Sequence, residues 1–225
     1  IEADEIASRL RKGLSLYNKT VDGQGIEYSG SDTFNTVSDI YKNDPSILSN
    51  STEKGTFGSK NETIRKKINF DNGDCYEGDL IGRFKHGKGK YIFGSGNVYE
   101  GDWFKDKRTG KGKFTWEDGD IYEGDFIEGK RTGKGKFTWK DGNVYKGDFV
   151  NNERTGKGKF TWKDGNVYKG DFVDGRREGK GKLIWTDGDV YEGNFIDGII
   201  TGKGKFTWAD GDVYKGDFVD GQREG

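Results

Sequence analysis

Polar and apolar positions alternate along this chain in short runs, and the pattern returns every 23 residues from about residue 64 to the end. Residues 133–150 show it most clearly, because two alternating runs, G-K-G-K-F-T-W and V-Y-K-G-D-F, are separated by K-D-G-N. Period-two alternation on both sides of an Asp-Gly turn signal predicts a β-hairpin. We therefore expect each unit to be one hairpin and successive hairpins to join into one antiparallel sheet.

Every unit is marked by a tyrosine with a glycine two residues after it. The tyrosines are Tyr76, Tyr99, Tyr122, Tyr145, Tyr168, Tyr191 and Tyr214. A fixed period of this length indicates a linear array, in which a unit buries its apolar face only by packing on its neighbours. The array makes about seven units, of which the last is incomplete. Such arrays offer long binding surfaces and seldom form catalytic pockets.

Side-chain parity divides each hairpin into two faces. Large rings and glycines share one face: Gly133, Gly135, Phe137 and Trp139 on the first strand, and Tyr145, Gly147 and Phe149 on the second. A ring that covers a glycine on the neighbouring strand stabilises such a sheet. We therefore expect a structural role for the repeated glycines, which include Gly101, Gly124, Gly135, Gly147, Gly158, Gly170 and Gly193.

The opposite face holds Lys, Thr, Asp and Glu. Exposed ion pairs between adjacent strands contribute about 0–1 kcal/mol each, so their expected role is solubility. The whole chain has 38 Lys and Arg against 39 Asp and Glu, a net charge of −1. These totals supply no basic stripe, which argues against nucleic-acid binding and weakens a role in binding anionic lipids.

No residues stand out as catalytic, cofactor-binding or metal-binding. The chain has one cysteine, Cys75, at a position that later units fill with Val or Ile, and one histidine, His86, in a loop. Any residue repeated seven times is expected to be structural, so we predict no enzyme and no cofactor. Turns such as Asp141-Gly-Asn143 offer too few oxygens for calcium, and turn chemistry explains them better.

The pattern Tyr122-Glu-Gly-Asp-Phe126, Gly133-Lys-Gly135 and Asp141-Gly142 resembles the MORN-repeat family (membrane occupation and recognition nexus) over residues 64–225. The resemblance implies an elongated, curved, single-layer antiparallel sheet that forms a rod or trough of roughly 65 Å. It also implies a scaffold or adaptor that holds a partner helix or peptide at membranes or the cytoskeleton. Phospholipid binding has been proposed for several family members.

Residues 1–63 do not follow the period, and we treat them as a separate segment from the array at 64–225. Residues 2–12 (E-A-D-E-I-A-S-R-L-R-K) have acids early, bases late and Gly13 directly after, which predicts a short helix. Residues 18–62 are rich in Ser, Thr, Asn, Asp and Gly, which predicts irregular chain. No apolar run is long enough for a membrane span, and no signal peptide is visible.

These features favour a non-enzymatic scaffold whose aromatic-glycine trough binds a partner protein segment. The alternative is a peripheral membrane tether that binds anionic phospholipids. Tyr and Trp tips, with a polar handle on an apolar body, are the predicted contacts. They are Tyr99, Trp116, Tyr122, Trp139, Tyr145, Trp162, Tyr168, Trp185, Tyr191 and Trp208.

Two alternatives stay open for these rings: they cover one another and the glycines, or they form aromatic cages for a cation. At Gly225 the chain stops halfway through a unit, so the last hairpin would leave an open strand edge. We expect the natural chain to continue there, or the edge to pair in a homodimer. The expected location is cytoplasmic, in association with membranes or the cytoskeleton.

Overall fold

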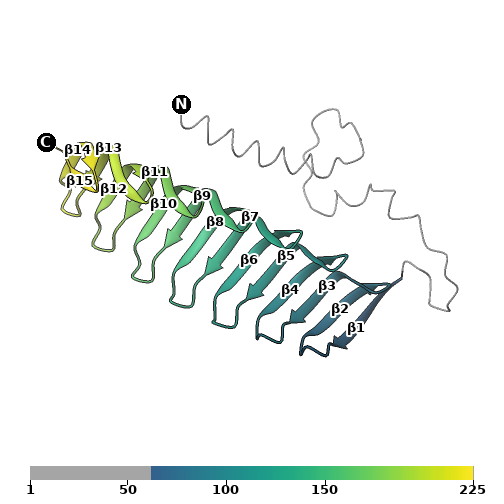
Figure 1. The fold of residues 1–225 in the computed structure, drawn as a ribbon. Coiled ribbons are helices and arrows are strands. Elements are labelled where there is room, and N and C mark those ends of the chain that lie inside the picture. Colours follow the sequence, from purple (N-terminus) through teal and green to yellow (C-terminus); the bar gives the residue numbers. More distant parts are fainter. Residues whose placement is uncertain (1–61, 225) are drawn as a thin grey trace, which may run out of the picture. The chain divides into compact units, whose positions relative to one another are not determined.

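The structure, a computed structural model, describes residues 62–224, which form one open antiparallel sheet of 15 strands. Each strand pairs with the strands before and after it in the sequence, so the strands follow one another in a single row from β1 to β15 (Figure 1). They are β1 (Thr63–Asn69), β2 (Cys75–Ile81), β3 (Phe84–Ile92), β4 (Val98–Phe104), β5 (Lys107–Thr115), β6 (Ile121–Ile127), β7 (Lys130–Thr138), β8 (Val144–Val150), β9 (Glu153–Thr161), β10 (Val167–Val173), β11 (Arg176–Ile184), β12 (Val190–Ile196), β13 (Ile199–Thr207), β14 (Val213–Val219) and β15 (Gln222–Arg223).

This architecture confirms the prediction of an all-β sheet of consecutive hairpins. The register also confirms the predicted faces, because Phe137 lies opposite Tyr145 and Gly135 lies opposite Gly147 on β7 and β8. The helix expected at residues 2–12 and the irregular chain at 18–62 fall outside the described residues, apart from Glu62. Those expectations stay predictions.

Two kinds of turn join the strands. Between β8 and β9 the two turn residues, Asn151 and Asn152, both have positive φ, 49° and 77°, which suits a tight two-residue hairpin. Between β7 and β8 the longer turn is closed by the Trp139 N–H, which donates to the Asn143 carbonyl at 3.0 Å. Gly142 in this turn has a φ of +96°, a conformation that favours glycine.

Side chains in the longer turns link one unit to the next. Asp141 Oδ1 accepts the N–H of Asn143 within the turn at 3.0 Å. Asn143 Oδ1 in turn accepts the N–H of Lys163, one unit further along, at 2.9 Å. These oxygens are used in hydrogen bonds that shape and connect the turns, which supports turn chemistry over a calcium site.

A bulge interrupts every second pairing, where an even-numbered strand from β2 to β12 meets the strand that follows it, and it lies just after the glycine that follows the tyrosine. On β7, Gly133 and Lys134 have no opposite residue on β6, because the register passes from Gly124–Gly135 to Asp125–Thr132. Asp125 satisfies the bulged backbone, since its Oδ2 accepts the Lys134 N–H at 3.1 Å. The regular glycine and aspartate of each unit therefore specify a repeated β-bulge, a feature that the sequence pattern did not reveal.

Candidate functional site

In every unit but the last, the tyrosine lies over two glycines on neighbouring strands of the ring-bearing surface, which we call the aromatic face. Gly147 on β8 lies opposite Gly158 on β9, and a Cβ added to Gly158 would come 2.5 Å from Cε2 of Tyr145. The Tyr145 hydroxyl donates to the main-chain carbonyl of Asp148 at 3.0 Å. A side chain larger than that of glycine would collide with the ring, so glycine is required here for close approach.

Six of the seven repeated tyrosines are fully buried, and only Tyr214 in the last unit is partly exposed. Tyr99, Tyr122, Tyr145, Tyr168 and Tyr191 are each 0% exposed. Because burial disfavours the charged phenolate, it raises the pKa of these hydroxyls above the ordinary value. Their tips are used inside the array, and a contact with a partner through them does not fit this structure.

Tryptophan and phenylalanine rings form a row along the outer part of the same face, which Leu183 interrupts between Trp162 and Trp185. Ring centroids are 5.2 Å apart for Trp116 and Phe137, 4.5 Å for Phe137 and Trp139, 5.4 Å for Trp139 and Phe160, and 4.8 Å for Phe160 and Trp162. The five tryptophans of this row are half-buried, whereas the tyrosines from Tyr99 to Tyr191 are fully buried. This tilted stacking leaves part of each indole open to solvent while its neighbours hold it in place.

Arginines extend over this row, one from each of several units. The Arg131 guanidinium lies 5.5 Å from the Trp116 ring centroid and 5.3 Å from that of Phe137. Its Nη2 donates to the Asn152 carbonyl at 3.0 Å, which fixes the side chain across the rings. Burial lowers the pKa of this guanidinium from its ordinary value. Contacts of a partly desolvated cation with rings stabilise by about 1–2 kcal/mol.

Sequence reasoning missed these arginines, although a signal was present. They recur with the 23-residue period at Arg108, Arg131, Arg154 and Arg177. Extending the strand parity from Gly133 back to Arg131 would have placed the arginine on the aromatic face. The periodic arginine at the start of the strand thus lies over the aromatic rings and does not point into solvent with the other polar side chains.

One unit departs from this pattern. Ile200 stands where the preceding units have arginine, and among residues 62–224 no Lys or Arg lies over the Trp185 ring. Trp185 packs on Phe206 at a centroid distance of 5.5 Å, and Ile200, like these two rings, is partly buried against the hydrophobic core. We call Trp185, Ile200 and Phe206 the apolar window of the row.

The chemistry on offer is recognition through rings and guanidinium groups. Within residues 62–224 there is no group of three His, Cys, Asp or Glu that could hold a metal ion. His86 stacks beside Phe104 at 5.0 Å, and burial lowers the pKa of its imidazole. In the same part of the chain, no helix has the length and apolar character that a membrane crossing needs.

Comparison with known families decides what this array is. The family model described as MORN repeat matches seven stretches, and each of them begins at one of the repeated tyrosines. They are residues 76–98, 99–121, 122–144, 145–167, 168–190, 191–213 and 214–225. The chain belongs to the MORN repeat family. The resemblance seen in the sequence is thereby confirmed, including the number of units.

Two solved structures are similar to the MORN array only distantly. The SAS-4 (dCPAP) TCP domain in complex with a proline-rich motif of Ana2 (dSTIL), from Drosophila melanogaster, is 12% identical with a TM-score of 0.45, over 75% of this chain and 97% of that one. The TCP10c domain of Drosophila melanogaster Sas-4 is 11% identical with a TM-score of 0.41, over 68% and 98%. At these TM-scores the likeness supports no functional argument. The comparison with curated proteins finds no match.

In the MORN array, the ten predicted contact residues separate into two groups. The tyrosines lie in the core over glycines, and the tryptophans lie in the half-exposed row. The predicted structural glycines line the tyrosine rings, because a Cβ added at any of them would come within 2.6 Å of a tyrosine side chain. They are Gly101, Gly124, Gly135, Gly147, Gly158, Gly170 and Gly193.

Proposed function

We propose that this MORN array is a non-enzymatic scaffold whose aromatic face binds a segment of a partner protein, as a helix or an extended peptide. The observation that supports the proposal most is the row of half-exposed tryptophans held by stacked phenylalanines. Trp and Arg are the residues that most often dominate binding energy at protein interfaces, and here both occur in each of several units. The contact residues are Trp116, Trp139, Trp162, Trp185 and Trp208.

The arrangement suggests how a segment would bind along the trough. Equivalent tryptophans in consecutive units are two strands apart, which is about 10 Å. A partner segment that follows the row would place one apolar side chain against each indole. The apolar window at Trp185 lacks an arginine and therefore suits the largest apolar side chain of the partner. The remaining N–H groups of the arginines can donate to carbonyl or carboxylate oxygens of the partner.

The proposal is tested by capture from native lysate with the full chain and two variants. Trp139→Glu with Trp162→Glu places a charge on the row, and a bound partner should be lost. Lys140→Glu with Lys163→Glu changes the next residue in the same two turns and should retain it. Lys140 and Lys163 occupy the place of Glu117 in an earlier unit, so this control suits the fold.

Circular dichroism and thermal unfolding must first show that both variants are folded. If the two glutamates unfold the array, the variant Trp139→Phe with Trp162→Phe is used in place of the glutamate variant. Phe93 occupies the tryptophan position of an earlier unit, so phenylalanine suits the fold there. A partner that the Trp139→Glu, Trp162→Glu protein captures as well as wild type does would contradict the proposal. Flotation with anionic vesicles and no captured protein would favour the membrane tether instead. The homodimer through the C-terminal strand edge stays a prediction for light scattering.

A further inference from the structure

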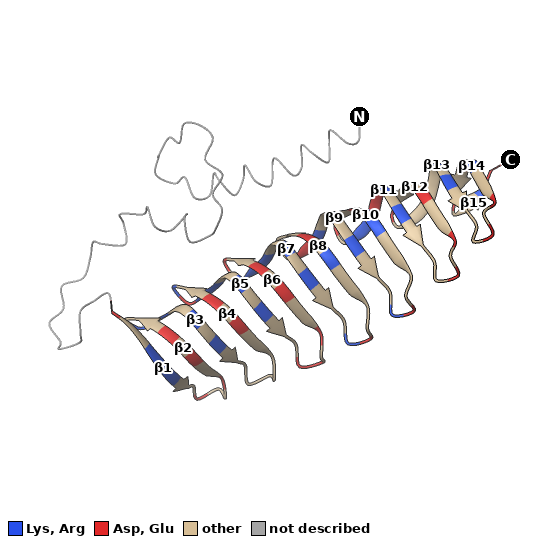
Figure 2. Ribbon diagram, turned by 180° about the vertical axis from the view of Figure 1, so that it is seen from behind, with Lys and Arg blue, Asp and Glu red and all other residues tan. Residues whose placement is uncertain are grey.

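A ladder of charged residues crosses the face opposite the rings, with one residue from each strand. In the first part it alternates in sign: Lys90 lies opposite Glu100, Glu100 opposite Lys113, and Lys113 opposite Glu123. Figure 2 shows this alternation of blue and red on β3 to β6. Each lysine of this part therefore has a carboxylate directly across the strand pair.

The alternation stops at β7, and the next five positions are all lysine. Lys136, Lys146, Lys159, Lys169 and Lys182 lie opposite one another on β7 to β11. Figure 2 shows a blue band on each of these strands, where blue and red bands alternate on the earlier ones. We call these five residues the lysine ladder. The balanced net charge of the chain concealed it, because acidic and basic residues are sorted along the array and not mixed evenly.

Only the two ends of the lysine ladder have carboxylate partners. Lys136 is 3.8 Å from Glu123, and Lys182 is 2.8 Å from Glu192. No described Asp or Glu forms an ion pair with Lys146, Lys159 or Lys169 in the middle. The cause is local in sequence, since Lys146 and Lys169 stand where Glu123 and Glu192 stand in the flanking units. Three neighbouring ammonium groups are thus left without a counter-charge from the described chain.

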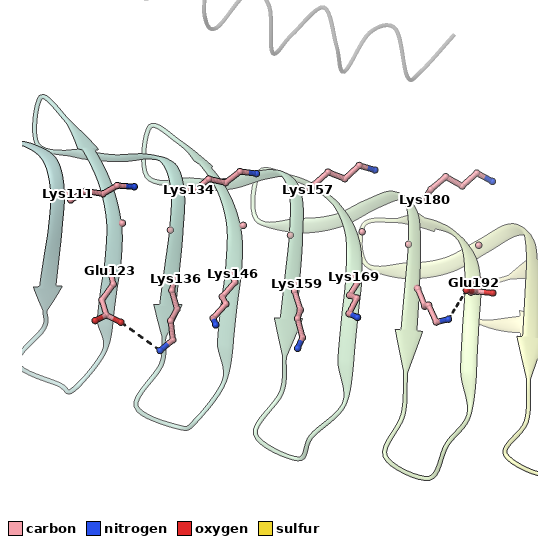
Figure 3. Close-up of a pocket in the computed structure, with 18 of the residues that line it drawn as sticks. Lys111, Glu123, Lys134, Lys136, Lys146, Lys157, Lys159, Lys169, Lys180 and Glu192 are labelled. Carbon is pink, nitrogen blue, oxygen red and sulfur yellow. Dashed lines mark ion pairs between the residues drawn. The ribbon is translucent and has the colours of Figure 1, made fainter. Parts of the chain in front are cut away.

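A second row of lysines runs beside the ladder, across a floor of glycines, and the two rows make a groove (Figure 3). Lys134 and Lys157 in this row are paired with Asp148 and Asp171, at 2.5 and 2.6 Å. Lys180 lies opposite Asn194 and has no such partner among the described residues. Because the floor has no side chains between the rows, the groove is open to a ligand along its length.

We propose that this groove binds an acidic α-helix of a partner protein, with its carboxylates on the lysine ladder. Neighbouring strands are about 4.8 Å apart, so the four intervals of the ladder span roughly 19 Å. A helix with acids spaced by three and four residues presents a carboxylate every ~5.3 Å, at 1.5 Å per residue. About 13 residues of helix would cover the ladder, and the small difference in spacing lies within the reach of flexible lysines.

An extended acidic strand matches the ladder less well. Its carboxylates on one face recur every two residues, about 6.6 Å apart, so over four intervals it would run roughly 7 Å past the lysines. Long lysine stems also line the groove with methylene groups, which suit the apolar flanks of a helix. The spacing and the charge therefore favour the helix. The lysine ladder lies on the face opposite the rings and is independent of the function proposed for them.

The test uses the full chain and two fluorescent peptides of about 18 residues and identical composition. One carries its glutamates on a single helical face, and the other distributes them around the helix. Fluorescence anisotropy in about 0.05 M and 0.15 M salt should show that the one-faced peptide binds at least about tenfold more tightly, and that salt weakens its binding.

The variant Lys146→Glu with Lys169→Glu restores the alternation of the flanking units and should weaken that binding at least about tenfold. The matched control, Lys140→Glu with Lys163→Glu, makes the same change of charge in the turns and should retain binding. If the first variant is not folded by circular dichroism, Lys146→Gln with Lys169→Gln replaces it.

Equal binding of the two peptides would overturn the proposal, and so would unchanged binding by the folded ladder variant. Binding of phosphatidylserine vesicles through these lysines, with no binding of the one-faced peptide, would also overturn it and identify a membrane surface. Because Trp139 and Trp162 are unchanged in these variants, the result does not depend on the partner of the aromatic face.

Discussion

The Tyr145 ring occupies the space that a side chain on Gly147 or Gly158 would need. This exchange of side-chain volume between neighbouring strands explains why the tyrosine and the glycines recur together. A single sheet without a second layer can bury its tyrosines completely only because the glycines leave room for the rings and the next unit covers them. At the residue scale, stability depends on these ring–glycine contacts, and the tryptophans and lysines are the residues that we propose for binding.

Gly158→Ala is expected to destabilise the array by about 1–3 kcal/mol, the usual cost of overpacking. Denaturant unfolding followed by circular dichroism measures it. In a double-mutant cycle with Tyr145→Leu the cost of the alanine should shrink, because the smaller side chain frees space. Gly175→Asn is the control and should change stability by less than about 0.5 kcal/mol, since Asn152 occupies the equivalent turn position with a similar φ. Additive effects in the cycle would contradict the account.

The buried tyrosines also predict a loss of stability at alkaline pH. Burial raises the pKa of Tyr76 to about 12 and moves those of the later tyrosines in the same direction. In the unfolded chain a tyrosine ionises near pH 10, so the unfolded state loses protons first. The contribution to stability is therefore complete below about pH 10 and is lost as the pH rises toward the folded pKa. Denaturant midpoints that stay constant from pH 8 to about pH 12 would contradict this.

At the scale of elements, each hairpin is shaped by its bulge and by the charges that flank it. Asp148 serves two neighbours, because its Oδ2 accepts the Lys157 N–H at 3.2 Å and its Oδ1 pairs with the Lys134 ammonium at 2.5 Å. Whereas these contacts of Asp148 stabilise the sheet, the lysine ladder is expected to destabilise it. Like charges directly opposite on adjacent strands destabilise a sheet by roughly 0.2–1 kcal/mol per pair.

The variant Lys146→Glu with Lys169→Glu is therefore expected to stabilise the free protein by about 1 kcal/mol at low salt. High salt should remove most of the gain, because screening weakens repulsion between exposed charges. Thermal unfolding at two salt concentrations measures the effect. A loss of stability would show that the lysines are structural, which would remove the reason to assign them a ligand.

The sequence predicted the hairpins and the two faces, because period-two alternation and turn residues are local signals. It did not predict the bulge at Gly133 and Lys134, since pairing across strands decides which residues have opposite partners. Burial of Tyr145 was missed for a related reason. The Tyr145 hydroxyl is hydrogen-bonded to the Asp148 carbonyl, and rings of the next unit cover the side chain. The alternation of side chains along a strand gives the face on which a residue lies, but it does not locate these contacts. The lysine ladder was missed because totals of charge hide local sorting.

For the whole molecule, the array is a chain of nearly identical units that contact only their neighbours along the sheet. Residues 132–150 and 155–173 have the same sequence, so two adjacent units offer interchangeable surfaces. Stability in such arrays is close to a sum of terms for units and their interfaces. The charge pattern of the polar face, in contrast, depends on which units are neighbours, as the run of five lysines shows.

Deletion of residues 133–155 is therefore expected to leave a folded array. The cut joins Thr132 to Gly156 and recreates the local sequence of the junction, because the deletion removes one full period. The product should unfold at lower denaturant, and it should bind the one-faced acidic peptide more weakly, since Lys136 and Lys146 are gone. A matched deletion of residues 133–152 breaks the period and should not fold. Circular dichroism and peptide binding measure both outcomes.

Site-specific photo-crosslinking can show whether the tryptophan row contacts the partner protein, as we propose. A photoreactive phenylalanine analogue is placed at Trp162 in one protein and at Lys163 in another, and each is exposed to native lysate. We expect a discrete crosslinked partner from position 162 and little or none from position 163. A partner that crosslinks from the turn position but not from position 162 would contradict the proposal.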